Sequence, residues 1–61
     1  MEYVVEKQHY DLVPGTVVSY VKESVADSNL HGTPYMVANN PKGELVVLPY
    51  YKLKPLDPVN L

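Results

Sequence analysis

The stretch ELVVLPYYKLKP, residues 44–55, restricts the fold more than any other part of the chain. A run of apolar residues leads to Pro49, which has no N–H group to donate and therefore ends or kinks a strand. An extended pattern resumes over YYKLK, residues 50–54, and predicts a second short strand after the break. Adjacent side chains of an extended chain point to opposite sides, so the backbone path at Pro49 decides whether Tyr50 and Tyr51 share a surface.

A hairpin is predicted immediately upstream, over residues 34–48. Its strands, PYMVA and ELVVL, are separated by NNPKG, residues 39–43, in which asparagine, proline and glycine each favour turns. Pairing across this turn places Val37 near Leu45, and we expect the face that carries them to be directed inward. Met36 is expected on the opposite face of the hairpin.

The rest of the chain is predicted to consist of strands joined by turns and loops. EYVVEK, residues 2–7, is a short apolar run between charged residues, and TVVSYVKE, residues 16–23, is rich in β-branched residues that favour strands. The polar segment that follows, residues 24–33, is expected to be a long loop in which Ser24 can cap a single helical turn. PLDPVNL, residues 55–61, is expected to be a proline-rich exit along the surface.

The composition is that of one small all-β domain covering residues 1–61. The chain is 46% apolar and rich in valine and tyrosine, which suit a half-buried pleated surface. It has no cysteine, so disulfides and thiolate metal sites are excluded. Packing or self-association must therefore supply the stability that a staple provides in many small domains.

Two local patterns resemble parts of SH3-like barrels. VPGTVVSYV resembles the turn and strand that precede the long loop of such a barrel. VVLPYYKLKPLD resembles the closing segment of SH3 domains, in which an apolar strand meets a proline, a 3₁₀ turn with a tyrosine and a last strand. The resemblance covers residues 13–56 and implies a small five-stranded SH3-like barrel. The chain has no tryptophan, which the proline-binding groove of true SH3 domains includes, so polyproline binding is not expected.

The resemblance also answers how the chain passes Pro49. It implies a 3₁₀ turn over the following residues, and both tyrosine rings can then reach one edge of the barrel. We predict that Tyr51 packs against the barrel and that Tyr50 is the more exposed of the two. Plugging the end of the barrel and forming a docking patch both stay open as roles for the tyrosines.

Several classes of function lose support from the sequence. His9 and Asp11 have the spacing of a dyad on a strand but lack an identified nucleophile, so we do not expect an enzyme. The two histidines and the scattered acids have no metal-binding spacing, and no glycine-rich phosphate loop is present, so we expect no metal and no cofactor. The net charge is −2 and arginine is absent, which makes nucleic-acid binding unlikely as a first interpretation.

The location of the protein is expected to be the cytoplasm. No apolar run approaches the roughly 20 residues that span a bilayer. Glu2 stands where a signal peptide would carry positive charge, so we expect a soluble protein that begins at Met1 and contacts no membrane.

The favoured function is a non-catalytic protein-binding module, which acts as a small inhibitor, modulator or accessory subunit of a larger protein. Compact single-domain products are common among phage and mobile-element genes, so such an origin is an expectation here. Contact is expected through a tyrosine-bearing face, through the loop 24–33, or by addition of a strand to a sheet edge such as residues 2–7. The candidate contact residues are Tyr20, Tyr35, Tyr50, Tyr51, Lys52, Lys54 and His31.

Two alternatives stay open. The first is a single-stranded nucleic-acid binder that stacks bases on exposed tyrosines and uses Lys52 and Lys54 for the backbone. The second is a structural homo-oligomer, in which the valine-rich faces of the hairpin are buried between copies of the chain.

Overall fold

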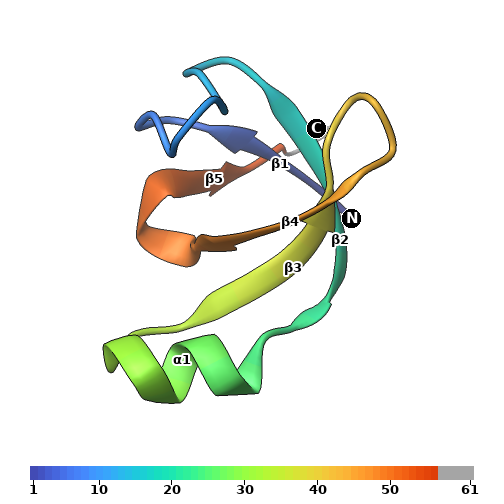
Figure 1. Ribbon diagram of the computed structural model, residues 1–61. Coiled ribbons are helices and arrows are strands. Elements are labelled where there is room, and N and C mark those ends of the chain that lie inside the picture. The colour runs from blue at the N-terminus through green and yellow to red at the C-terminus, as the bar shows by residue number, and fades with distance from the viewer. Residues whose placement is uncertain (57–61) are drawn as a thin grey trace, which may run out of the picture.

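The computed structural model describes residues 1–56; the end of the predicted proline-rich exit, residues 57–61, lies outside the described residues. Residues 1–56 form five strands, one α-helix and one 3₁₀ helix (Figure 1). In chain order these are β1 (Glu2–Val5), β2 (Val17–Glu23), α1 (Val25–His31), β3 (Tyr35–Asn39), β4 (Leu45–Pro49), η1 (Tyr50–Lys52) and β5 (Leu53–Pro55). The prediction of a mostly β domain is confirmed.

The strands form a single antiparallel sheet in the order β4-β3-β2-β1-β5. Within residues 1–56 this sheet is not closed, because β4 and β5 are its two edges and do not pair with each other. Five antiparallel strands are therefore confirmed, whereas a closed barrel is not. The strand at residues 2–7 was expected at an edge, but β1 pairs with β2 on one side and β5 on the other, so it has no free edge for a partner strand.

The sheet curves around one apolar core (Figure 1). Side chains alternate between the two faces of a strand, and every strand contributes inward-facing apolar residues. The buried core consists of Val5, Leu12, Val18, Met36, Ala38, Leu48 and Leu53. Four of its members, including Met36 and Leu48, are fully buried at 0% exposure, which is the close packing that a small domain without disulfides needs.

The loop of residues 6–16 covers part of the core at the open side of the sheet. It folds back on itself at a two-residue turn, where His9 and Leu12 exchange backbone hydrogen bonds of 3.0 Å in both directions. This turn directs Leu12 into the core, where only 7% of the residue is exposed. The loop is bound to η1, because the Glu6 N–H donates to the Lys52 carbonyl over 2.8 Å.

The predicted hairpin is present, but its register and its inward face differ from the prediction. Val37 pairs with Val47 instead of Leu45, because the Asn40 N–H donates to the Glu44 carbonyl and closes a five-residue turn around Lys42. The face expected to point inward is the outer one, and Leu45 is 67% exposed. The core takes the other face, where Met36, Ala38 and Leu48 pack in one cluster with Val5 from β1 and Val18 from β2.

The segment expected to be a long loop contains a helix, α1, of seven residues. Ser24 is its N-cap and donates its hydroxyl to Asp27, while Gly32 ends the helix in the left-handed conformation at φ 69°. The Ser28 hydroxyl donates to the Ser24 carbonyl over 2.7 Å and accepts the Tyr35 N–H over 2.8 Å. A short polar segment is therefore helical because Gly32 caps its C-terminus through a bond to the Ser28 carbonyl, and because the Ser28 hydroxyl is bound to β3. None of the helices in residues 1–56 is long and apolar enough to cross a membrane.

Substitution of Ser28 by alanine should lower the free energy of unfolding by about 2 kcal/mol, because the N–H of buried Tyr35 loses its acceptor. Denaturant unfolding measures the change. Asn29→Ala is the matched control, since Asn29 is exposed on the same helix and alanine favours helices. Equal effects of the two substitutions would show that the Ser28 hydroxyl is not the tether.

Candidate functional site

The chain turns after Pro49, and the two tyrosines take the opposite places to those predicted. The 3₁₀ helix η1 over residues 50–52 is present as expected. Tyr50 packs against the core, where its ring lies edge-on to Tyr3 at a centroid distance of 6.0 Å, and its N–H donates to the Pro34 carbonyl over 3.1 Å. Tyr51 is 58% exposed. The prediction was wrong because the chain leaves the extended conformation at Tyr50, whose ring packs on Tyr3 and whose phenol bonds to Glu23.

Tyr20 and Tyr50 form a structural cluster with Glu23. Both phenols donate to the same carboxylate oxygen, Glu23 Oε2, over 3.1 Å from Tyr20 and 2.5 Å from Tyr50. Burial, and after it the Glu23 carboxylate, raises the pKa of both phenols above the ordinary value. A shift of pairing between Tyr20 and Lys22 brings Glu23 to the side where η1 lies. These two candidate contact residues therefore join β2 to η1 with hydroxyls that are already engaged.

A second group of aromatic side chains comes from the loop 6–16, α1, β3 and η1. In Figure 1, η1 lies between the loop 6–16 and α1. We call this group the aromatic edge, and its members are His9, Tyr10, His31, Tyr35 and Tyr51. His31 stacks on Tyr35 with ring centroids 4.8 Å apart and planes inclined by 24°. Burial raises the pKa of Tyr35, and the neighbouring phenols of Tyr51 and Tyr10 and the Asp27 carboxylate raise it further. Three of the predicted contact residues are thus close together.

Tyr10 is the member of the aromatic edge that the sequence did not indicate. It is 86% exposed and takes a positive φ of 56°, in the left-handed region where glycine and asparagine are favoured. It lies in the two-residue turn between His9 and Leu12, and its carbonyl accepts the Gln8 side-chain amide over 2.9 Å. Asp11 is a common turn residue, but a tyrosine is not expected at the position of positive φ, so residue type does not indicate the conformation of Tyr10.

The two candidate lysines have different surroundings. The Lys52 ammonium lies 3.3 Å from the Gln8 carbonyl and 3.3 Å from His9 Nδ1. Burial lowers the pKa of His9, and the charge of Lys52 lowers it further, whereas the backbone carbonyl of Val47 acts in the opposite direction. Lys54 is exposed on β5, where its backbone pairs with Val4. The Lys52 ammonium is therefore already bound to groups of the same chain, whereas Lys54 is exposed.

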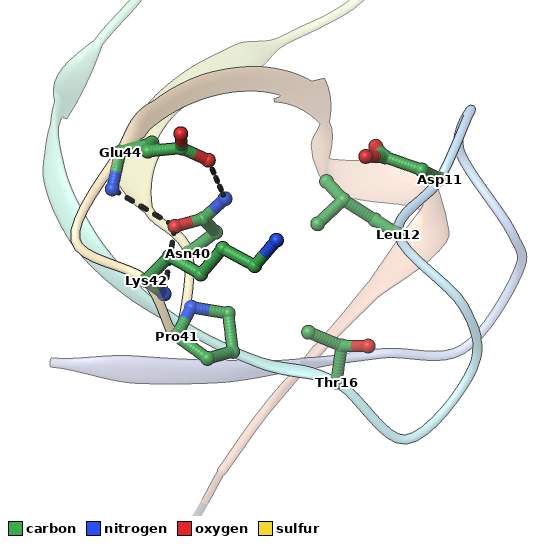
Figure 2. Close-up of a pocket in the computed structure, with 7 residues that line it drawn as sticks. All are labelled: Asp11, Leu12, Thr16, Asn40, Pro41, Lys42 and Glu44. Atoms are coloured by element: carbon green, nitrogen blue, oxygen red, sulfur yellow. Dashed lines mark hydrogen bonds between the residues drawn. The ribbon is translucent and has the colours of Figure 1, made fainter.

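A small polar pocket of about 180 Å³ separates the loop 6–16 from the hairpin turn (Figure 2). Asp11 lines one side, and Asn40, Lys42 and Glu44 line the other. The Asn40 amide donates to Glu44 over 3.0 Å, and its oxygen accepts the backbone N–H groups of Lys42 and Glu44 over 2.9 Å. Most polar groups on the hairpin side already form the hydrogen bonds of the turn. The shape of the pocket therefore results from the structure of the turn.

Residues 1–56 contain no group of three or more histidine, aspartate or glutamate side chains that could hold a metal ion. Comparison of the chain with protein-family models, with curated proteins and with solved structures gave no match. A function is therefore inferred from the arrangement of side chains. The aromatic edge brings rings from several segments of the chain close together.

Substitution of Glu23 by glutamine should lower the pKa of Tyr50, because the negative charge beside the phenol is removed. The pKa should stay above the ordinary value of 10, since burial is the larger cause of the shift. Carbon NMR of the ring Cζ during a pH titration measures it. Glu44→Gln, an exposed acid in the hairpin turn, is the control and should leave Tyr50 unchanged. An unchanged Tyr50 titration in the Glu23 variant would contradict the cluster.

Proposed function

We propose that the protein is a non-catalytic protein-binding module and that the aromatic edge is its docking surface. Such a chain would act as a small inhibitor, modulator or accessory subunit by occupying the surface of a larger protein. The cysteine-free sequence suits a cytoplasmic setting. We also propose that the curved sheet, with η1 between β4 and β5, is a variant of the small SH3-like barrel in which the loop 6–16 covers the open side.

The observation that carries the proposal is the conformation of Tyr10. A bulky residue in the left-handed region costs about 1 kcal/mol or more, and such residues are concentrated at functional sites. Tyr10 is 86% exposed, so its side chain returns little of that free energy through burial in the free protein. A glycine would serve this turn better, and the presence of a tyrosine is explained if the ring is buried against a partner.

The neighbours of Tyr10 support the same function. Tyr51 exposes 58% of its surface, and exposed His31 stacks on Tyr35, which is itself only 9% exposed. Tyrosine is enriched in protein interfaces because it offers a large rigid area and a polar tip at a low entropic cost. The proposed contact set is therefore narrower than the set taken from the sequence, since Tyr20 and Tyr50 already bind Glu23.

The two alternatives have less support. A nucleic-acid binder needs cations beside its stacking rings, and Lys52 contacts Gln8 and His9. Self-association has one observation in its favour, because Leu45 is 67% exposed and Val47 is 37% exposed on the outer face of the hairpin. Sedimentation over a dilution series tests it, and a monomer at micromolar concentration would exclude it as the working state.

Substitution of Tyr10 by glycine should raise the free energy of unfolding by about 1 kcal/mol, because glycine adopts the positive φ without strain. The same substitution should weaken partner binding. Denaturant unfolding measures the first effect. A variant that is less stable than the wild type would show that the ring of Tyr10 stabilises the free protein and is not held for a partner.

The docking surface is tested by replacing Tyr10 with a photoreactive phenylalanine and irradiating the host cells that contain it. We expect an adduct with one defined protein, and we expect Tyr51→Ala to reduce its yield. The same photoreactive residue at Leu45 is the matched control, because Leu45 is exposed on the outer face of the hairpin. No adduct at position 10, or an equal adduct at position 45, would refute the aromatic edge as the site, and an adduct with a second copy would favour self-association.

A further inference from the structure

The loop 6–16 is attached to η1 through contacts that converge on one residue, Lys52. The backbone carbonyl of Lys52 accepts the N–H of Glu6 over 2.8 Å and the N–H of Lys7 over 3.3 Å. Its ammonium lies 3.3 Å from the Gln8 carbonyl and 3.3 Å from Nδ1 of His9. Four consecutive loop residues therefore depend on the position of Lys52, and the turn that carries Tyr10 follows directly after them.

The contact between His9 and Lys52 is possible only while the imidazole is neutral. An ammonium has only donors, so Nδ1 of His9 must act as the acceptor, with the ring proton on Nε2. In the protonated imidazole both ring nitrogens are donors, and two positive charges then lie 3.3 Å apart. The contact changes from attraction to repulsion with the uptake of one proton.

The other groups around His9 do not neutralise this repulsion. Tyr10 of the same loop faces the ring edge-on at a centroid distance of 4.7 Å, and from β4 the neighbouring group is the backbone carbonyl of Val47. The nearest carboxylate in sequence, Asp11, lines the loop side of the pocket that faces the hairpin turn (Figure 2). From η1 the facing charged group is Lys52.

We propose that His9 and Lys52 form a proton-operated latch, which holds the loop 6–16 on η1 when His9 is neutral and releases the loop when His9 is protonated. Histidine suits this role because it is the side chain that ordinarily titrates between pH 5 and 8. The latch is a property of the free protein and needs no partner.

The direction of the pH effect follows from the environment of His9. Burial and the charge of Lys52 hold the pKa of His9 below its ordinary value of 6.5. The released loop, in which the ring is solvated, thus binds a proton at a higher pH than the latched loop does. Above pH 6.5 the latched form has its full stability. It loses stability as the pH falls from 6.5 through the lowered pKa of His9.

Release would also change the aromatic edge. Tyr10 follows His9 and contacts its ring, so movement of the loop separates Tyr10 from Tyr51 and Tyr35. Partner binding would then weaken on acidification. This consequence rests on the proposed function, whereas the latch itself does not.

Amide hydrogen exchange of the isolated chain, followed by NMR, tests the latch. The probes are the Glu6 and Lys7 amides, which bond to the Lys52 carbonyl, and the reference amides lie in β3, a strand inside the sheet. Between about pH 7.5 and about pH 5, after correction for intrinsic exchange rates, their protection should fall several-fold relative to β3. Equal protection at the two pH values would overturn the proposal.

Three variants make the test specific. His9→Gln keeps an acceptor for Lys52 but does not titrate, so the pH-dependent loss of protection should vanish. Lys52→Met removes the repelling charge and should reduce the pH-dependent loss of protection, leaving the part that burial of His9 causes. His31→Gln, which alters the other histidine of the aromatic edge, should leave the loss intact. A pH-dependent loss of protection that persists in the His9 variant would overturn the latch. If the latch is observed but no photo-adduct forms at position 10, only the docking function is refuted.

Discussion

The turn at Pro49 and η1 is the constraint on which the rest of the structure depends. It takes the chain from β4, at one edge of the sheet, to β5, at the other edge. The turn is held by backbone bonds in which the Tyr50 N–H donates to the Pro34 carbonyl and the Leu53 N–H donates to the Tyr50 carbonyl. The same short helix anchors the loop 6–16, receives the Glu23 cluster through Tyr50 and exposes Tyr51. One turn thus fixes the core, the covering loop and the aromatic edge together.

How much of this the sequence could predict depends on the range of the interactions involved. The break at Pro49 and the hairpin of residues 34–48 were predictable, because a missing N–H and a turn rich in asparagine, proline and glycine act locally. The inward face of the hairpin was not, because Met36 becomes buried only when β1 and β2 supply the opposite wall of the core. The full helix α1 was not predicted for a similar reason, since Ser28 is bound to a strand that begins seven residues later.

Of the contact residues named from the sequence, His31, Tyr35 and Tyr51 lie in one group, whose role as a docking surface stays a proposal. The sequence could not show which tyrosine hydroxyls are already bonded, because the Glu23 carboxylate accepts from Tyr20 on its own strand and from Tyr50 in η1. Tyr10 was missed because its significance lies in its backbone conformation, which no residue type in the turn indicates.

The pairing of β1 with β5 also bears on how the protein is made. The first strand of the chain has the last strand as one of its two neighbours, so the sheet joins residues from both ends of the described chain. Synthesis proceeds from the N-terminus, and β5 leaves the ribosome after every other strand. Until then β1 has one unpaired edge, and η1 is not there to receive the loop 6–16. The nascent chain therefore completes this sheet, its loop anchor and its aromatic edge in one step, after β5 has been made.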